Sequence, residues 1–426
     1  MPAWLAALFT RRMLICVFTG FASGMPLYLL LNLVPAWLRT EGVSLKAIGL
    51  FALIQFPYTW KFLWSPLLDR YALPLLSLGR RRGWILLTQA ALLVIIALLG
   101  RLSPANDLGT IVWMAAFLAF LSATADIALD AYRRELLTDH ELGLGNSVHV
   151  NAYRIAGLVP GSLSLILADR LPWETVFLIT ALFMLPGMGL ALLVKEPVIA
   201  GGAPRTLREA VVEPFREFID RAGLKEALLI LAFIFLYKLG DSMCTALATP
   251  FYLDMGYAKS DIGLVAKHAG LWPAVIGGLL GGLWMVNLGI NRALWLFGVV
   301  QVVSIFGFAW LAWLGPQTAI DAAALLRLAL VIGFEALGVG LGTAAFVAFI
   351  ARTTHPLYTA TQYALFSSLA AVPRTFVNAT TGWLVEWMGW MTFFMLCVLL
   401  ALPGMALLLK VAPWRTNHNT TTALQK

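Results

Sequence analysis

Apolar runs and short polar breaks alternate along the whole chain. Runs of about 18 or more apolar residues recur from end to end, which is the length that a membrane-spanning helix needs. The predicted spans are 13–37, 45–67, 84–101, 111–132, 145–168, 173–194, 223–250, 260–286, 293–314, 322–350, 358–385 and 390–410. The runs lack the ten-residue alternation of a membrane barrel. The pattern therefore predicts an all-α membrane protein with about twelve transmembrane helices.

The second half of the chain echoes the first at an offset of roughly 215 residues. Three short segments recur in the same order, with one residue deleted between Leu38 and Gly42: Pro35–Leu38, Gly42-Val43 and Ile48–Leu50 return as Pro250–Leu253, Gly256-Tyr257 and Ile262–Leu264. A further segment, Trp173–Phe177, returns as Trp390–Phe394. Two parallel six-helix repeats are the architecture of major facilitator transporters, which this organisation resembles.

The domain organisation follows from that repeat. Residues 1–194 are predicted to form an N-terminal six-helix bundle and residues 223–412 a C-terminal one. Residues 195–222 form a predicted cytoplasmic linker with a short amphipathic helix, and residues 413–426 a cytoplasmic tail.

Composition and charge agree with a membrane protein. A chain that is 60% hydrophobic and 12% charged has more apolar surface than soluble cores can bury, so a water-soluble protein is excluded. With a cytoplasmic N-terminus, 19 of the 30 Lys and Arg fall on the inner side and 6 on the outer side. This bias predicts that both termini are cytoplasmic. It also explains the net charge of +8 without a nucleic-acid partner, because the charge is spread over many loops.

A polar motif joins the second and third predicted helices. Asp69-Arg70-Tyr71 and Gly79–Gly83 resemble the facilitator loop motif, with Ser65 in place of its first glycine and about seven residues inserted. An aspartate at such a corner can accept hydrogen bonds from a neighbouring helix N-terminus and pair with arginine. We therefore predict that Asp69, Arg70, Arg80 and Arg81 gate the cytoplasmic side. A purely topological role of the arginines is compatible with this.

Among the charged side chains inside the predicted spans, nine are candidates for function, and each costs about 2.5–3.5 kcal/mol if it faces lipid. They are Lys61, Asp126, Asp130, Arg154, Lys238, Asp241, Lys267, Glu335 and Arg374. They must face a wet cavity or one another, so we expect the functional residues to be among them.

The acids are the predicted proton-coupling residues: Asp126, Asp130, Asp241 and Glu335. Asp126 and Asp130 lie one helical turn apart, and such a pair favours holding a proton near neutral pH. Asp126 has no basic neighbour on its own helix, whereas Asp130 can instead form a structural salt bridge with Arg133 or Arg134. Lys238 and Asp241 are three apart and can pair with each other.

Among these nine candidates, five bases oppose four acids, which favours an anionic substrate. The predicted substrate-binding residues combine these bases with amphipathic side chains that suit sugar rings: Tyr28, Asn32, Trp60, Lys61, Arg154, Lys238, Lys267 and Arg374. Each tryptophan can instead belong to the interfacial belt.

Several segments resemble the muropeptide permeases of Gram-negative bacteria, the AmpG type. They are Gly20–Leu27, Lys61–Tyr71, Gly79–Trp84 and Ser122–Tyr132. The resemblance implies a monomeric, proton-driven importer of anhydro-muropeptides in the bacterial inner membrane, without cofactor or metal. It further implies a role in cell-wall recycling and β-lactamase induction. By matching motif, Lys61, Asp126 and Asp130 carry over as functional residues.

Two other functions are weighed against this one. A related branch resembles acetyl-CoA transporters, which also carry a bulky anion. A multispan membrane transferase would need a catalytic constellation on a substantial loop, and the longest loop, about Lys195 to Lys225, contains no histidine.

Overall fold

Every regular element that the structure describes is a helix. The computed structural model describes residues 7–43, 56–73, 78–196, 207–257, 265–317, 320–372 and 376–414. Within these ranges all regular elements are α-, 3-10 or π-helical, which confirms the all-α prediction. The chain divides into two compact units: Met1–Phe215 with Thr354–Ser368, and Arg216–Thr353 with Leu369–Lys426.

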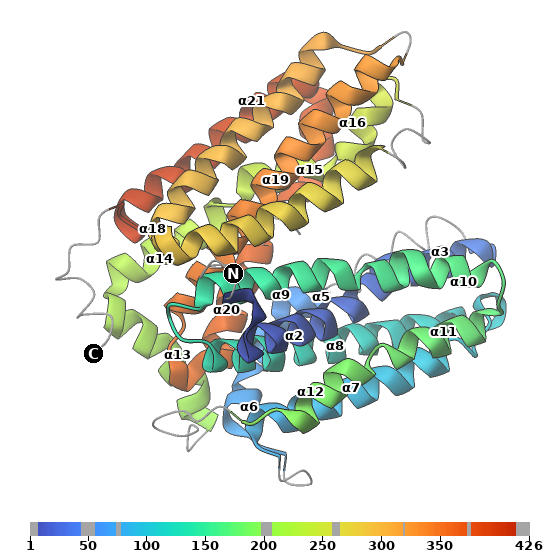
Figure 1. Cartoon of the computed structure of the whole chain (residues 1–426), viewed down its shortest axis with the longest axis vertical. Helices are drawn as coiled ribbons and strands as arrows, with labels where there is room; N and C mark the ends of the chain where they lie inside the picture. The colour runs from blue at the N-terminus through green and yellow to red at the C-terminus, as the bar shows by residue number, and fades with distance from the viewer. Residues whose placement is uncertain are drawn as a thin grey trace. The chain divides into compact units, whose positions relative to one another are not determined.

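The first unit is a bundle in which several helices are interrupted (Figure 1). Its elements up to residue 194 are η1 (Ala7–Phe9), α2 (Arg11–Tyr28), η2 (Leu29–Leu33), α3 (Val34–Thr40), α5 (Phe56–Trp60), η4 (Lys61–Leu63), α6 (Ser65–Arg70), α7 (Arg80–Leu99), α8 (Pro104–Leu136), α9 (Leu142–Ala156), η5 (Val159–Leu163), α10 (Ser164–Ala168), α11 (Trp173–Leu182) and α12 (Leu185–Leu193). The π-helical segment η2 follows Pro26, and η5 contains Pro160. Proline removes a backbone donor, which explains these breaks in regular helix.

Helix α20 (Thr359–Val372) brings a distant part of the chain into the first unit, through its residues up to Ser368. Ala360 and Ala364 on this helix belong to the apolar core of that unit. The short 3-10 helix η7 (Pro356–Tyr358) leads into α20 and lies against α6. The end of α6 is therefore adjacent to the beginning of α20.

Two glycines allow α2 and α9 to pack at backbone distance. A Cβ added at Gly20 would collide with the carbonyl oxygen of His149, and one at Gly24 with that of Tyr153. Small residues spaced four apart permit such close helix contacts in membranes. Gly20 and Gly24 thereby fix how α9 presents its side chains to the rest of the unit.

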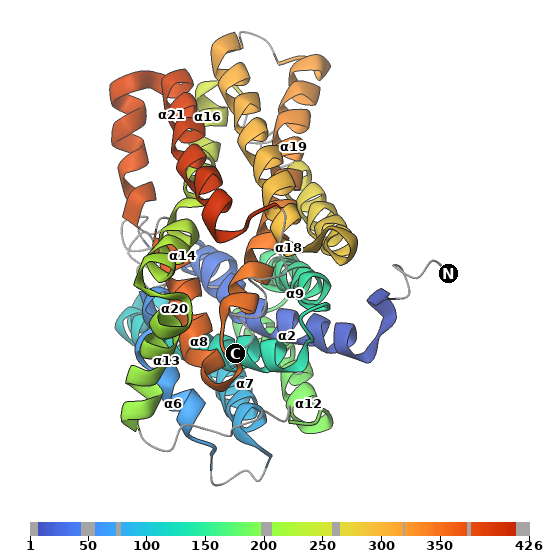
Figure 2. The same cartoon turned by 90° about the vertical axis from the view of Figure 1, so that its left-hand side faces the viewer.

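The second unit contains long helices with internal breaks (Figure 2). Its elements are α14 (Leu224–Leu236), α15 (Leu239–Ala246), α16 (Ala248–Asp254), α18 (Lys267–Leu314), α19 (Ala322–Thr353), η9 (Asn378–Thr380) and α21 (Thr381–Val411). Helix α18 packs along α19, and α21 packs along α14 and α15. Gly289 in α18 and Gly389 in α21 have positive φ, so each divides its element into two helices.

The predicted amphipathic segment after residue 205 is helical. It forms α13 (Leu207–Ala222), which contains Pro214. The predicted domain boundaries at 194, 222 and 412 stay predictions.

Over the described ranges, nine helices are long and apolar enough to cross a membrane. One of them, His268–Leu314, contains a predicted span and most of the span before it, and the predicted span 45–67 lies partly outside the described residues. Fusion across glycine breaks thus accounts for part of the difference from about twelve predicted spans.

The predicted repeat is visible in backbone geometry, with a corrected register. Gly42 has φ 84° and Gly256 has φ 91°. In each unit the residue after the glycine donates its N–H to the carbonyl five residues before it, at 2.9 Å in the first unit and 3.1 Å in the second. Leu38 therefore corresponds to Tyr252, so the predicted deletion between Leu38 and Gly42 is wrong and belongs further upstream.

The corrected register also matches the aromatic contacts of the two units. Trp37 packs against Phe177 with ring centroids 4.9 Å apart. Its counterpart Phe251 packs against Phe394 at 4.8 Å. Phe177 and Phe394 belong to the second pair of repeated segments in the sequence. In each unit, this second repeated segment therefore packs against the first one.

Candidate functional site

A buried charged cluster occupies the first unit, where η4, α8 and α9 meet. Lys61 begins η4, a 3-10 turn directly after α5. Asp126, Asp130 and Arg133 follow one another at spacings of four and three on α8, so they lie along one face of that helix. Lys61 is 4% exposed, Asp130 6% and Arg133 1%. The cluster is therefore largely removed from solvent.

Asp126 has two partners from other elements. Lys61 donates from Nζ to Oδ2 of Asp126, and Ser23 on α2 donates to Oδ1. The sequence places no base near Asp126 on its own helix, and the structure provides Lys61 from η4 instead. A lysine and an aspartate that hold each other across a packing interface satisfy charges that would be costly in isolation.

Asp130 combines the two interpretations that its sequence neighbourhood leaves open. Its Oδ1 lies 2.8 Å from Nη2 of Arg133, the predicted structural salt bridge. Its Oδ2 also lies 3.7 Å from Nζ of Lys61, which Asp130 shares with Asp126. If both acids are ionised, the two bases and two acids leave the cluster with no net charge.

Arg133 links the cluster to two further elements. It donates from Nε to Oδ1 of Asn146 on α9 and from Nη2 to the hydroxyl of Tyr363 on α20, both at 2.8 Å. Its guanidinium also lies over the ring of Tyr363. Through this arginine, helices α8, α9 and α20 are tied to the same carboxylate, that of Asp130.

The predicted sugar-binding aromatics engage other rings in the first unit. Tyr28 meets Tyr153 edge-on at 5.5 Å, and Trp60 stacks with Phe56 at 5.5 Å and with Phe62 at 6.0 Å. Trp60 precedes Lys61 directly, so one of these rings lies next to the charged cluster along the chain.

Four further predicted substrate residues have different surroundings. Asn32 is exposed in the π-helical segment η2, and Arg154 is half-buried near the end of α9. The side chain of Lys267 and the whole of Arg374 lie outside the described residues. Substrate binding by all of these residues stays a prediction.

The predicted gate residues form a second buried cluster, at the junction of α6, α7 and α20. Asp69 is fully buried and accepts from Nη2 of Arg81 at 2.7 Å. It also accepts from the backbone N–H groups of Ala360 at 3.2 Å and Thr361 at 2.8 Å, and from the Thr361 hydroxyl at 2.7 Å. Asp69 therefore meets both an arginine and a helix N-terminus, the two kinds of partner that its motif predicts.

Glu135 completes this second cluster. Its carboxylate lies 2.5 Å from Nη2 of Arg81 and 3.7 Å from Nη2 of Arg80, while Nη1 of Arg80 donates to the backbone carbonyl of Asp69 at 2.6 Å. Arg70 instead lies over the ring of Tyr71, at 5.2 Å from its centroid. Arg81 is thus held between two acids, and a gating role for these residues stays a prediction.

The second unit has a simpler ion pair. Nζ of Lys238, the residue that precedes α15, lies 2.8 Å from Oδ2 of Asp241 in the first turn of that helix. Asp241 also lines a small pocket with Tyr237, Gly298 and Gln301. Glu335 is buried on α19, at 6% exposure. Proton coupling by Asp241 or Glu335 stays a prediction.

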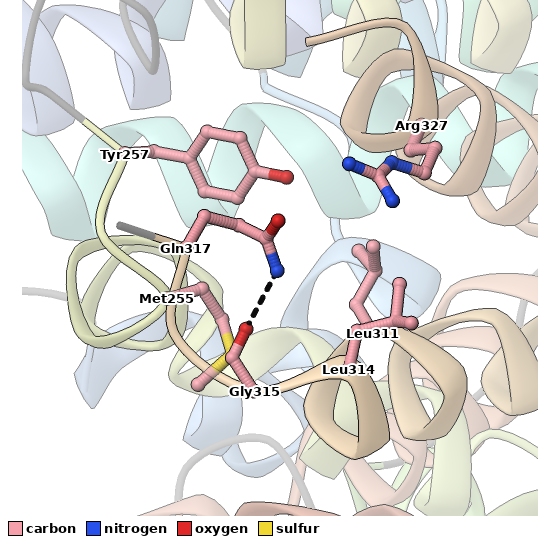
Figure 3. A pocket seen from close by; sticks show the side chains of 7 residues that line it. All are labelled: Met255, Tyr257, Leu311, Leu314, Gly315, Gln317 and Arg327. Carbon is pink, nitrogen blue, oxygen red and sulfur yellow. Dashed lines mark hydrogen bonds between the residues drawn. The ribbon is translucent and has the colours of Figure 1, made fainter. Parts of the chain in front are cut away.

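Another pocket of the second unit lies where α16, α18 and α19 end or begin (Figure 3). Tyr257, Gln317 and Arg327 line it together with apolar side chains, and the Gln317 amide donates to the carbonyl of Gly315 at 3.0 Å. None of these residues was a predicted site residue.

Sequence reasoning missed most partners of the predicted residues. They are Ser23, Glu135, Asn146, His149, Thr361 and Tyr363. Ser23 stands between Gly20 and Gly24, a signal for close packing on α2, but its partner on α8 cannot be read from one sequence. The contacts of α20 with Asp69 and Arg133 join residues more than 200 positions apart.

Membrane-length helices with buried charges inside them are typical of a multi-pass membrane protein. Comparison with known proteins identifies the family. The family model described as Major Facilitator Superfamily matches residues 16–376. Among solved structures, the transporter FucP in the outward conformation matches with TM-score 0.70 at 12% identity, covering 96% of this chain and 100% of that one, which shows a common fold.

Two curated relatives are much more similar in sequence. An uncharacterised protein of Haemophilus influenzae is 52% identical over 98% of this chain and 98% of its own length. The anhydromuropeptide permease of Escherichia coli K12 is 41% identical over 93% of this chain and 79% of its own. The chain therefore belongs to the major facilitator superfamily and, within it, to the AmpG-type family of permeases. The predicted fold and family are confirmed, and the protein is a transporter rather than an enzyme.

Proposed function

We propose that this protein is a proton symporter that imports anhydro-muropeptides across the bacterial inner membrane. The substrate is N-acetylglucosaminyl-1,6-anhydro-N-acetylmuramic acid, with or without its peptide. The similarity to the Escherichia coli anhydromuropeptide permease supports this substrate. We also propose that transport runs from periplasm to cytoplasm and serves cell-wall recycling.

The observation that carries the proton coupling is the buried cluster around Lys61. Its two carboxylates share one lysine, and Asp130 also pairs with Arg133. If one acid takes up a proton, two bases face one remaining negative charge, and the cluster becomes net positive. A net positive interior favours an anion, so proton uptake and binding of a lactyl or peptide carboxylate reinforce each other.

The cluster around Asp69 supports a proposed gate. Asp69 is held by Arg81 and accepts from the first turn of α20, so three elements are joined at one buried carboxylate. Movement of α20 away from α6 would break several charge-assisted hydrogen bonds together, which gives a closed state with discrete contacts. We place this gate on the cytoplasmic side, with both chain termini, and treat the protein as a monomer.

Uptake into proteoliposomes tests the function directly. Purified protein is reconstituted, and accumulation of the labelled anhydro-disaccharide is measured with and without an imposed pH gradient. The peptide-bearing form, acetyl-CoA and a neutral disaccharide are compared in parallel. We expect gradient-dependent accumulation of both anhydro-muropeptides. Preferential accumulation of acetyl-CoA would replace the substrate, and accumulation that ignores the pH gradient would refute the symport.

A further inference from the structure

We propose that His149 shares the transported proton with Asp130. This inference rests on the proposed proton coupling and adds a residue to it. His149 lies on α9 and is buried at 5% exposure. Its Nδ1 contacts the hydroxyl of Thr19 on α2 at 3.0 Å, and its Nε2 lies 3.9 Å from Oδ1 of Asp130 on α8. The imidazole thus stands between an alcohol and a carboxylate.

The hydrogen bonds of Thr19 determine which ring nitrogen carries the proton. A hydroxyl has one hydrogen, and that of Thr19 donates to the backbone carbonyl of Cys16 at 3.0 Å. A carbonyl oxygen can only accept, so towards the ring the Thr19 oxygen must itself accept. Nδ1 of His149 is therefore the donor, and in the neutral ring Nε2 carries a lone pair.

That assignment places two acceptors opposite each other. The lone pair of Nε2 faces the ionised carboxylate of Asp130, and neither group has a hydrogen to offer. One added proton resolves this: it bonds to Nε2 or to Oδ1, the other atom accepts it, and no other bond forms or breaks. At 3.9 Å the pair is open, about 1 Å longer than an N–H···O hydrogen bond. Proton loading would draw the two side chains together.

The charges around His149 link uptake of this proton to the charge of the substrate. Asp130 and Arg133 approach His149 from α8, Lys61 belongs to the same cluster from η4, and α2 contributes the Thr19 hydroxyl. With both acids ionised, the cluster has no net charge. A proton shared by His149 and Asp130 leaves the carboxylate pairs with Lys61 and Arg133 in place and adds one positive charge, which matches one carboxylate on the substrate.

The packing of α9 on α2 fixes the position of the ring. Gly20 lets the backbone at His149 approach α2 directly, and Thr19 is its neighbour in the chain. A side chain at position 20 would push away the backbone that carries the imidazole. The same contact that holds the helices together therefore sets the distance from His149 to Thr19 and to Asp130.

Two transport modes separate a proton-handling role from a structural one. His149→Gln keeps a polar side chain of similar size but does not titrate. We expect accumulation under a pH gradient to fall by about tenfold or more. Exchange of labelled for unlabelled anhydro-disaccharide at equal pH on both sides should persist within about twofold. Equal loss of both modes, or no loss of either, would overturn the inference.

His140→Gln is the matched control, because His140 is exposed in the segment before α9 of the same unit. It should leave both transport modes unchanged. Thr19→Val removes the acceptor for Nδ1–H and should lower gradient-driven accumulation. Thr19→Ser keeps a hydroxyl at this position and should accumulate substrate as the wild type does. Loss of gradient-driven accumulation in Thr19→Ser would contradict the hydrogen-bond argument.

Nitrogen NMR tests the proton position independently of transport. In protein labelled with [15N]histidine and held in lipid nanodiscs, the signals absent from His149→Gln belong to His149. They should report the Nδ1–H tautomer at neutral pH, and Thr19→Val should change them. The opposite tautomer would refute this inference while leaving the proposed function intact. Wild-type protein that shows the expected tautomer but no gradient-driven uptake would instead refute the proposed function.

Discussion

The two units share a repeat but connect their intramembrane charges differently. In the first, Lys61 on η4 pairs with Asp126 and Asp130 on α8, so the ion pairs cross from one element to another. In the second, Lys238 and Asp241 are three residues apart and pair locally. A pair between elements changes when those elements move, whereas a local pair moves as one body. We therefore predict that coupling of a charge to a conformational change depends on the first unit.

The largest expected difference between the units comes from neutralising one acid in each. Asp126→Asn leaves Lys61 buried with only the more distant Asp130, and removing one partner of a buried pair costs about 3–5 kcal/mol. We expect loss of pH-driven accumulation in proteoliposomes, while Asp241→Asn retains most of it. Equal loss in both variants would abolish the contrast between crossing and local pairs.

A double variant separates stability from transport at the same place. Lys61→Met with Asp126→Leu replaces the pair by apolar side chains, which is often neutral for stability. Thermal unfolding should return close to wild type, and accumulation should stay absent. Recovery of accumulation would show that the charges are structural only.

Asp69→Asn should have the next largest effect. The substitution removes the charge that accepts from Arg81, Ala360 and Thr361, and a hydrogen bond to a charged group contributes about 1.5–3 kcal/mol. The comparison in the second unit is the hydrogen bond from Arg352 to Asn291, at 2.6 Å. Asn291 lies two residues after the glycine break in α18, and in this pair only the arginine is charged. Thermal unfolding in detergent should therefore be lowered more by Asp69→Asn than by Arg352→Gln, and the reverse order would contradict this difference.

Helix packing is where the units should behave alike. Gly20 faces the carbonyl oxygen of His149 in the first unit, and Gly340 faces that of Ala274 in the second. Gly20→Ala and Gly340→Ala should each destabilise by about 1–3 kcal/mol, because backbone cannot yield as a side chain can. Gly109→Ala is the control, since a Cβ there meets no atom within 4 Å. A loss in Gly109→Ala similar to the other two would invalidate the steric argument.

The smallest effect is expected at the surface of the first unit. Glu141 is partly buried, which raises its pKa, but hydrogen bonds from Thr138 and the charge of Arg12 outweigh burial and hold that pKa below its usual range. A carboxyl whose pKa is lower folded than unfolded stabilises the fold above its unfolded pKa, and this contribution disappears as the pH falls through the folded value.

Glu141→Gln should therefore lower stability by less than about 1 kcal/mol at neutral pH. Melting temperatures of the variant and the wild type, measured from pH 7 to pH 4, should converge on acidification. A difference that grows at low pH would reverse the sign of the argument.

The fold was largely predictable, because a bilayer sets a minimum length for a membrane-spanning helix and the apolar runs of the sequence reach that length. The charged site was only partly so. The helical period alone puts Asp126 and Asp130 on one face, and the spacing of Lys238 and Asp241 predicts their pair. Lys61 and Asp126 meet only through packing of η4 on α8, and Arg133 meets Tyr363 across 230 positions. Contacts of that kind depend on backbone distances, which periodicity does not specify.

The matched turns at Gly42 and Gly256 show which part of the repeat tolerates sequence change. Each has one left-handed glycine and one five-residue hydrogen bond, although Leu38 and Tyr252 share no chemistry. A helix end of this kind needs the glycine alone, so the side chains around it can change while the backbone turn stays the same. A search for internal repeats in membrane proteins could therefore score each left-handed glycine together with the hydrogen bond that closes its turn. In this chain such a score aligns Leu38 with Tyr252, one position from the alignment by residue identity.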